Sequence, residues 1–450
     1  MKNMKRLLAV LLAGRLLLTA CGIAAAEQEV RKIETAADAE EWVTARLGEH
    51  PEELDGAWSM SAQMEAAVTK MGGSTGLAKG LAGLGEIREI GAAYEGDVQG
   101  YKAYYIPCVF KAMSVDLVML VQDGAIASLT TGLYNGGRQA ETESDVFDRV
   151  ELALEVPGLG ELPGILTVPK GNGPFPVVIL LQGSGSSDKD ETVGNLKPFR
   201  DIAEGLAEKG VAVYRYDKRT YVYGAQMAQD RGGTLMEETI EDAAAAVQLL
   251  AKQEKIDPQR IFVAGHSLGG MAVPAIDREL RKAENKACGY ILMAAPARGF
   301  DTVLREQYDF LYSLMPEVPE EAQAEKDQLF RELDRLNDPS SLKEDDVIAG
   351  VYAPYWIWMK NYDITGEAEE ITAPCLLLQG EEDYQVTMED FRLWKEAVGA
   401  KENWKLISYP GLVHVFVSGK KEEGAAVYSR AQKVDDRVIG DIAGFVNETK

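Results

Sequence analysis

The sequence RIFVAGHSLGG, at residues 260–270, combines an apolar run with a glycine-rich turn around Ser267. The β-branched and aromatic residues of 260–265 favour a strand, and residues 271–283 favour a helix. Residues 265–269 (GHSLG) match the GxSxG pattern, in which glycines relieve crowding around a serine held in a strained turn. The pattern alone is weak evidence, but its place between a strand and a helix strengthens it. Ser267 is therefore a candidate nucleophile.

The segments on both sides of this turn alternate between strands and helices. The apolar run FPVVILL at 175–181 indicates a strand covered on both faces of a sheet. Two strands, at 150–155 and 162–168, are expected to enter this sheet antiparallel. The other expected strands are 211–216, 289–294, 375–378 and 404–409, and the expected helices are 199–209, 236–252, 391–397 and 434–446. This alternation implies βαβ units in a mostly parallel sheet.

One connection in this domain is much longer than the others. Between the expected strands at 289–294 and 375–378 lie roughly eighty residues, far more than a βα connection needs. Regularly spaced leucines predict an acidic helix there, and YAPYWIWMKNY at 352–362 is rich in aromatic residues. We expect residues 299–372 to form a helical lid inserted into a domain that spans 148–450. The aromatic side chains either line an acyl pocket or pack the lid itself.

A serine hydroxyl is a poor nucleophile unless an imidazole accepts its proton. The chain has three histidines, and His50 lies in the N-terminal segment. His266 adjoins the serine and is expected to point elsewhere. His414 ends the loop YPGLVH (409–414), directly after the last expected strand of the sheet. We therefore expect His414 to be the base.

The acid that orients this imidazole is expected at the end of the preceding strand. The sequence GEED, at 380–383, follows the apolar run CLLLQ and precedes His414 in the chain. Asp383 is favoured because a G-x-x-D placement after this strand suits the architecture. Glu381 and Glu382 remain alternatives.

Acyl transfer also needs two N–H donors that stabilise the developing oxyanion. Leu268, directly after the serine, is expected to supply one of them. The loop after the apolar strand 175–181 is expected to supply the other, from Ser184, with Gly183 or Gly185 as alternatives.

Two charged clusters lie near these candidates. Asp188, Asp190 and Glu191 could suggest calcium, but they lack the glycine and the twelfth-position glutamate of an EF-hand loop, so a polar loop at the mouth of the site is favoured. The run YRYDKR, at 214–219, either contacts substrate or forms a structural ion-pair network beneath the site.

The composition excludes several classes of function. The chain has 450 residues, with 47 Lys and Arg against 72 Asp and Glu, which gives a net charge of −25. Binding to nucleic acid or to an anionic lipid surface needs a basic patch, so neither is expected. Three histidines are too few for a histidine-based zinc site, and no P-loop or credible G-x-G-x-x-G pattern appears, so no cofactor is expected. The sequence does not indicate an oligomeric state.

The N-terminal third of the chain follows another pattern. Helical spacing of apolar residues changes to strand-like alternation at about residue 87, and Asp123-Gly124 supplies a hairpin turn. We expect a small α+β domain at 35–134 and a polar linker at 135–147. Cys108 and two later cysteines, Cys288 and Cys375, lie far apart in apolar segments, which favours buried thiols over disulfides.

The first residues resemble an export signal, with a basic start (MKNMKR) and an apolar stretch too short to span a bilayer. Leu18-Thr19-Ala20-Cys21 resembles the lipobox of bacterial lipoproteins, although Arg15 interrupts the apolar stretch. That resemblance implies removal of 1–20, a diacylglycerol group on Cys21 and a tether at 21–34. We therefore expect an extracytoplasmic protein anchored to the bacterial membrane through Cys21. If Cys21 is not lipidated, the alanines after it offer a cleavage site and a secreted protein.

Residues 148–450 resemble an α/β-hydrolase of the bacterial esterase and dienelactone-hydrolase-like branch. The resemblance rests on five segments: GSGSSDKDET (183–192), YDKRTYVYG (216–224), GHSLGG (265–270), LLLQGEEDYQV (377–386) and YPGLVH (409–414). The order Ser267, Asp383, His414 is also that of the α/β-hydrolases. The upstream part resembles small accessory domains fused to exported bacterial hydrolases.

The resemblance implies hydrolysis of a small acyl ester through an acyl-enzyme with a Ser-His-Asp triad. A peptidase, an acyltransferase or a thioesterase on the same triad is an alternative. A binding lipoprotein without catalysis is another.

Overall fold

The computed structural model describes residues 30–46, 58–81, 87–98, 101–110, 114–132, 144–430 and 432–449. The expected signal, Cys21 and residues 135–143 of the expected linker lie outside these ranges. The chain divides into two compact units. One contains residues 1–142 with 193–195 and 428–431, and the other contains 143–192, 196–427 and 432–450.

The N-terminal unit packs helices against an antiparallel sheet. Its described helices are α2 (Ala36–Arg46), α3 (Ala62–Met71) and α4 (Gly73–Leu81). Its strands are β1 (Ile87–Ile90), β2 (Tyr94–Val98), β3 (Tyr101–Phe110), β4 (Ser114–Gln122) and β5 (Ala125–Gly132), in the order β1-β3-β4-β5 with β2 also paired to β3. Asp123 and Gly124 both have positive φ, 53° and 81°, as a two-residue hairpin turn requires. Trp42 and Tyr104 lie fully buried in the core between helices and sheet.

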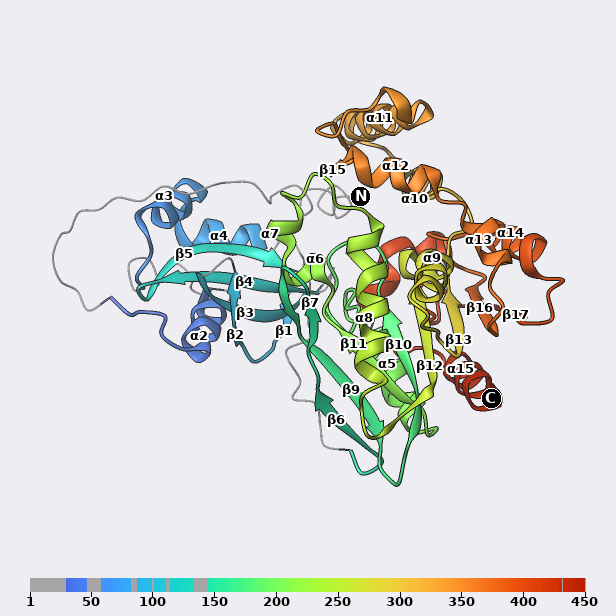
Figure 1. Ribbon diagram of the computed structural model, residues 1–450. Helices are drawn as coiled ribbons and strands as arrows, with labels where there is room; N and C mark the ends of the chain where they lie inside the picture. Colours follow the sequence, from blue (N-terminus) through green and yellow to red (C-terminus); the bar gives the residue numbers. More distant parts are fainter. Residues whose placement is uncertain are drawn as a thin grey trace. The chain divides into compact units, whose positions relative to one another are not determined.

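The second unit is built on a sheet whose described strands follow the order β17-β16-β13-β12-β10-β11-β9-β6 (Figure 1). The strands are β6 (Phe147–Glu151), β9 (Gly164–Pro169), β10 (Phe175–Leu181), β11 (Ala212–Tyr216), β12 (Ile256–His266), β13 (Gly289–Met293), β16 (Cys375–Gly380) and β17 (Trp404–Tyr409). The strands from β11 to β17 pair parallel, and β9 and β6 are antiparallel additions at the edge. The sheet is therefore mostly parallel, as the alternation of the sequence predicts.

The first of the two entry strands differs from the prediction, whereas the second, expected at 162–168, is β9 and pairs antiparallel. The chain leaves the sheet after β6, and residues 154–156 form β7, which pairs with β8 (Gly160–Leu162) in a separate hairpin. Leu152 and Leu154 continue the alternation of β6, so the pattern could not reveal the break. The break lies where Gly164 passes close to Leu152, because a Cβ on Gly164 would lie 2.5 Å from the Leu152 carbonyl oxygen.

Helices cover both faces of this sheet. The covering helices are α5 (Pro198–Ala207), α8 (Glu241–Leu250), α9 (Leu268–Lys282), α14 (Met388–Val398) and α15 (Asp436–Glu448). Successive side chains of a strand point to opposite faces. In β10, Val177 and Ile179 accordingly pack in the core that includes α8 and α9, whereas Val178 and Leu180 pack in the core that includes α5 and α15. The continuous apolar run of β10 is explained by this double burial.

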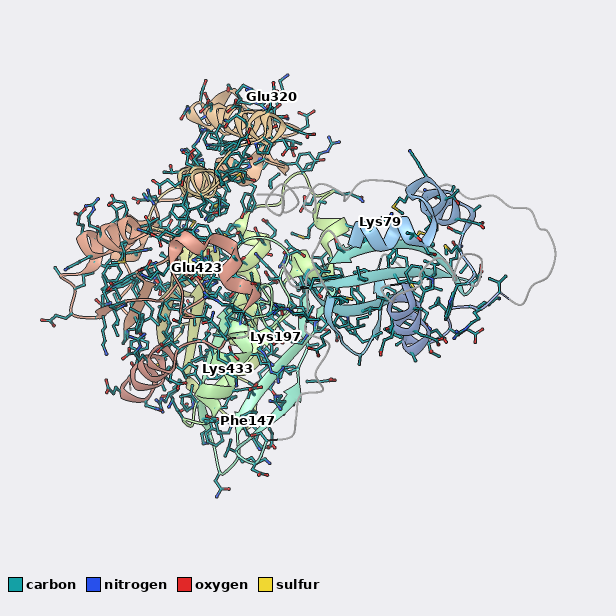
Figure 2. The ribbon with its side chains drawn as sticks, turned by 180° about the vertical axis from the view of Figure 1, so that it is seen from behind. Lys79, Phe147, Lys197, Glu320, Glu423 and Lys433 are labelled. Carbon is teal, nitrogen blue, oxygen red and sulfur yellow. The ribbon has the colours of Figure 1, made fainter. Side chains whose placement is uncertain are left out.

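A helical segment connects β13 to β16. It contains α10 (Phe300–Ser313), α11 (Glu320–Asp334), the short strands β14 (Val347–Ile348) and β15 (Val351–Tyr352), α12 (Ala353–Asn361) and α13 (Ile364–Glu369). Glu320 marks the start of α11 in Figure 2. Leu333, Leu336, Ile348 and Trp356 give the segment a small core of its own.

Tyr362, directly after α12, fixes this segment to α9. Its hydroxyl donates to the carbonyl of Met271 (2.8 Å) and accepts from the N–H of Ala275 (3.1 Å). The hydroxyl thus bridges the carbonyl of Met271 and the N–H of Ala275, two groups that bond to each other directly in a regular helix. The neighbouring Pro274 has no N–H, so the hydrogen bonding of α9 is already interrupted at this point. Among the described residues no helix is both long and apolar enough to cross a membrane.

Candidate active site

Ser267 stands at the turn between β12 and α9, with φ 52° and ψ −118°. Positive φ is costly for a residue with a side chain, so the surrounding structure must impose this conformation. Two glycines allow the backbone segments around Ser267 to pack closely enough to impose this conformation. A Cβ on Gly265 would lie 2.1 Å from the Gly269 carbonyl oxygen, and a Cβ on Gly269 would lie 2.5 Å from that of Leu181. The strained turn expected from GHSLG is thus present.

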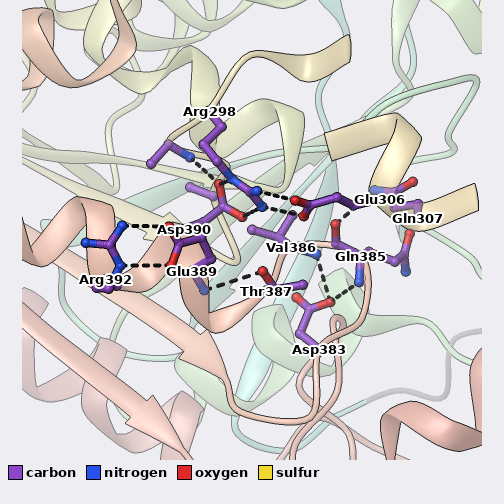
Figure 3. A network of polar contacts seen from close by, with 12 residues as sticks. Arg298, Glu306, Gln307, Asp383, Gln385, Val386, Thr387, Glu389, Asp390 and Arg392 are labelled. Carbon is purple, nitrogen blue, oxygen red and sulfur yellow. Dashed lines mark hydrogen bonds and ion pairs between the residues drawn. The ribbon is translucent and has the colours of Figure 1, made fainter. Parts of the chain in front are cut away.

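Asp383 and His414 meet at the carboxyl end of the same sheet, from the loops after β16 and β17. The Nδ1 of His414 lies 2.7 Å from Oδ2 of Asp383, and both side chains are buried. The other oxygen of Asp383 accepts the N–H groups of Gln385 (2.7 Å) and Val386 (3.0 Å) (Figure 3). Gln379 donates to Oδ2 as well (3.2 Å). These donors fix the orientation of the carboxyl group of Asp383, which faces Nδ1 of His414.

The two alternative acids lie elsewhere. Glu381 is exposed and accepts a hydrogen bond from the hydroxyl of Ser408 (2.8 Å). Glu382 accepts only a long bond, from the N–H of Lys421 (3.4 Å). Among the described residues neither carboxylate bonds to His414, so the geometry favours Asp383.

His414 packs beside the serine turn. Its ring centroid lies 4.5 Å from that of His266, the residue directly before Ser267. No hydrogen bond joins the Ser267 hydroxyl to His414 in the described part of the chain. Catalytic hydrogen bonds are often long in enzymes without substrate and tighten when substrate binds. The structure therefore brings the serine and the histidine to one place without closing the bond between them.

The loop after β10 faces the serine from the other side. A Cβ on Gly183 would lie 3.1 Å from Cβ of Ser267, so a larger residue would crowd the serine. The N–H of Gly183 donates to Oε1 of Glu191 (2.6 Å) and is therefore already used. Within the described ranges, the N–H groups of Ser184, Gly185 and Leu268 bond to no other residue. Of the two alternatives to Ser184, Gly183 is disfavoured by its bond to Glu191.

The sequence did not identify two residues of this site. His266, expected to point elsewhere, pairs its Nδ1 with Glu191 (2.9 Å) and its Nε2 with the carbonyl of His414 (3.1 Å). Burial lowers the pKa of His266, but the charge and hydrogen bond of Glu191 outweigh it, so the pKa is raised. Glu191 and His266 are 75 positions apart, and no spacing rule connects them.

The basic run at 214–219 forms ion pairs. Arg215 bonds to Asp190 (2.9 Å), Lys218 to Glu238 (2.5 Å) and Arg219 to Asp242 (2.6 Å), and all three cations are buried. These bonds favour the ion-pair interpretation over direct contact with substrate. No group of acids, histidines or cysteines suited to a metal ion occurs among the described residues.

Comparison with known protein families identifies the family of this chain. Residues 194–420 match the family described as serine aminopeptidase, S33, and this range contains Ser267, Asp383 and His414. The chain belongs to this family. The chain is also similar to Esterase EstD of Thermotoga maritima, with 34% identity over 366 residues that cover 81% of this chain and 84% of the relative. The S33 chain is therefore an esterase-like α/β hydrolase, and it is an enzyme.

Solved esterase structures are also similar to the S33 chain. Est1E from Butyrivibrio proteoclasticus has a TM-score of 0.44 and 18% identity, covering 66% of this chain and 99% of that one. The Pyrococcus furiosus esterase Pf2001 has a TM-score of 0.42 and 18% identity, covering 67% of this chain and 91% of that one.

Proposed function

We propose that Ser267, His414 and Asp383 form a catalytic triad that hydrolyses carboxylic esters through an acyl-enzyme. The observation that carries the proposal is the buried bond of 2.7 Å between Asp383 and His414, beside the strained turn of Ser267. The carboxylate fixes Nδ1 as the protonated nitrogen, which leaves Nε2 as the proton acceptor. The name of the similar Thermotoga maritima protein, an esterase, supports esters as the substrate class.

The proposed reaction has two halves. The Ser267 oxygen attacks the acyl carbon while its proton moves to Nε2 of His414. The N–H groups of Leu268 and Ser184 stabilise the negative oxygen that forms, and the ester C–O bond breaks as the imidazolium returns the proton to the departing alcohol. Water then attacks the acyl-enzyme with His414 again as base, which releases the acid and restores the serine.

A peptidase is the second candidate, because the matching family is described as a serine aminopeptidase. A substrate comparison on purified protein separates the two. We expect kcat/KM to be highest for p-nitrophenyl butyrate, lower for a butyryl thioester and lowest for an aminoacyl p-nitroanilide. If the anilide is cleaved as fast as the ester, the peptidase assignment replaces the esterase assignment.

We also infer that the helical segment between β13 and β16 acts as a lid. Its first helix contacts the loop that carries Asp383. Gln307 on α10 donates to the carbonyl of Gln385 (3.1 Å), and Phe310 stacks on Tyr384 with ring centroids 5.3 Å apart. A helix held against the acid loop in this way is well placed to cover a bound acyl chain.

The anchoring of the chain through Cys21 remains part of the proposal. The lipobox-like sequence LTAC supports a lipoprotein outside the cytoplasm, with the unit at 35–134 as an accessory domain. The variant Cys21→Ser is expected to move the enzyme from the membrane fraction to the soluble fraction. An unchanged distribution would exclude the anchor.

A further inference from the structure

Both ring nitrogens of His266 face hydrogen-bond acceptors. Its Nε2 lies 3.1 Å from the carbonyl oxygen of His414, and its Nδ1 lies 2.9 Å from Oε1 of Glu191. A backbone carbonyl can only accept, and a neutral imidazole has one N–H. The ring satisfies both partners as an imidazolium facing a carboxylate, in a pair that is almost fully buried.

The same carboxylate oxygen reaches a third part of the site. Oε1 of Glu191 also accepts the N–H of Gly183, at 2.6 Å. The pair thus connects the loop after β10, the serine turn and the loop that carries His414. Glu191 adopts a positive φ of 50°, a conformation that a residue with a side chain rarely takes unless its surroundings impose it.

Lys218 fixes the other side of Gly183. Its ammonium group donates to the Gly183 carbonyl at 2.7 Å and is itself paired with Glu238. In a planar trans peptide, the carbonyl of Gly183 and the N–H of Ser184 point in opposite directions. A bond that fixes this carbonyl therefore also fixes the direction of the Ser184 N–H.

We propose that the imidazolium–carboxylate pair of His266 and Glu191, with Lys218, is a positioning device that aims the Ser184 N–H at the oxyanion and holds the His414 loop beside Ser267. This inference rests on the proposed function of the site. The three residues act through the backbone groups of their neighbours and are positioning residues.

The burial of Glu191 argues against a purely stabilising role. Its second oxygen, Oε2, is buried and bonds to no described residue. A buried carboxylate with one oxygen unsatisfied loses hydration without full compensation. The isostere Gln keeps the shape of Glu191 and removes its charge, so thermal unfolding of this variant is measured alongside its catalysis.

The variant Glu191→Gln tests the inference through transition-state binding. We expect kcat for p-nitrophenyl butyrate to fall about 10- to 100-fold with KM nearly unchanged, less than the loss of a whole oxyanion donor. The affinity for a butyryl trifluoromethyl ketone, whose adduct carries the oxyanion, should fall by a similar factor. The matched control Glu389→Gln changes an exposed carboxylate on α14 and should leave kcat, KM and ketone affinity unchanged.

A fluorophosphonate probe separates the two possible failures. If the wild-type chain neither hydrolyses the ester nor labels at Ser267, the proposed function itself fails. If the wild type is active and labelled but Glu191→Gln keeps wild-type kcat and ketone affinity, the positioning inference alone is overturned.

A second measurement is made on the wild type and does not use Glu191→Gln. With three histidines in the chain, ring ¹⁵N spectra of the wild type can be assigned by comparison with His266→Gln. We expect both ring nitrogens of His266 to carry protons at about pH 7, where an unperturbed histidine is mostly neutral. A single protonated nitrogen would overturn the imidazolium assignment.

Discussion

Two histidine–carboxylate pairs lie side by side at this site, and they differ in what the second ring nitrogen meets. In the pair of His414 with Asp383, Nδ1 is bonded and Nε2 bonds to no other described residue. In the pair of His266 with Glu191, Nε2 is occupied by a backbone carbonyl. Both pairs are buried, and both carboxylates accept backbone N–H groups.

Under the proposed function, this difference separates His414, the base, from His266, the positioning cation. A buried carboxylate beside an imidazole does not by itself create a proton acceptor, because the remaining nitrogen must be open toward the nucleophile. His266 directly precedes Ser267 in the chain, yet its Nδ1 pairs with the carboxylate of Glu191 and its Nε2 with the backbone carbonyl of His414. In the proposed triad, the histidine that activates the serine is thus not the one beside it in the sequence.

The largest expected effect is the loss of activity when the proposed nucleophile is removed. The variant Ser267→Ala removes the group that His414 activates, and kcat should fall by at least ~10⁴-fold. Hydrolysis of p-nitrophenyl butyrate measures it, with thermal unfolding as the check on the fold. The half-buried Ser408, whose hydroxyl bonds to Glu381 and not to the triad, supplies the control Ser408→Ala, which should keep the wild-type rate. Comparable rates for Ser267→Ala and the wild type would exclude Ser267 as the nucleophile.

The next effect tests the acid of the catalytic pair. The variant Asp383→Asn keeps the shape of the side chain but no longer favours the Nδ1–H tautomer, so kcat should fall about 10³- to 10⁴-fold. The neighbouring variants Glu381→Gln and Glu382→Gln are matched controls and should stay within about twofold of the wild type, since neither acid bonds to His414. Loss of activity in either control with normal activity in Asp383→Asn would move the acid to that neighbour.

A third test concerns an ion pair near Asp383 that contains no histidine. Arg298 donates to the fully buried Asp390 (2.7 Å), and Arg392 contacts the exposed Glu389 (Figure 3). Arg298→Leu leaves a buried carboxylate unpaired and should lower the free energy of unfolding by about 3 kcal/mol. Arg392→Leu should leave the melting temperature unchanged, because its pair is exposed. Equal melting temperatures for both variants would contradict this assignment.

The smallest effect concerns a carboxylate without an imidazole partner. Burial raises the pKa of Asp201 to about 6, against the opposing hydrogen bond from the N–H of Val434. The folded chain therefore binds this proton more tightly than the unfolded chain, so the contribution to stability is present at low pH and is lost as pH rises through about 6. Asp201→Asn should raise the free energy of unfolding by about 1–3 kcal/mol at pH 8 and by less at pH 5. Urea unfolding at both pH values measures it, and an equal gain at both would contradict the cause given.

The sequence predicted those parts of the fold that depend on local patterns. The run FPVVILL and the turn GHSLG each specify their own structure, because double burial and close backbone contact leave few alternatives. The break after β6 was missed because the apolar alternation continues through it. The helix α10 was also missed as a separate element, since the whole connection was predicted only as a lid.

The residues of the site also fall into those that the sequence predicts and those that it does not. Ser267, Asp383 and His414 could be nominated because each follows a strand whose place in the sheet is predictable. The contact between Glu191 and His266 could not, since it depends on how a loop turns back over the end of β10. Sequence patterns thus indicate which chemical groups reach the edge of the sheet, whereas the bonds among them come from packing.

The most direct test of the central claim is the rate and position of labelling by a fluorophosphonate, read by peptide mass spectrometry. We expect one adduct per chain, on Ser267, and a labelling rate at least ~100-fold lower in His414→Ala, because the serine then has no base. An adduct on another residue, or an equal rate in the His414 variant, would contradict it.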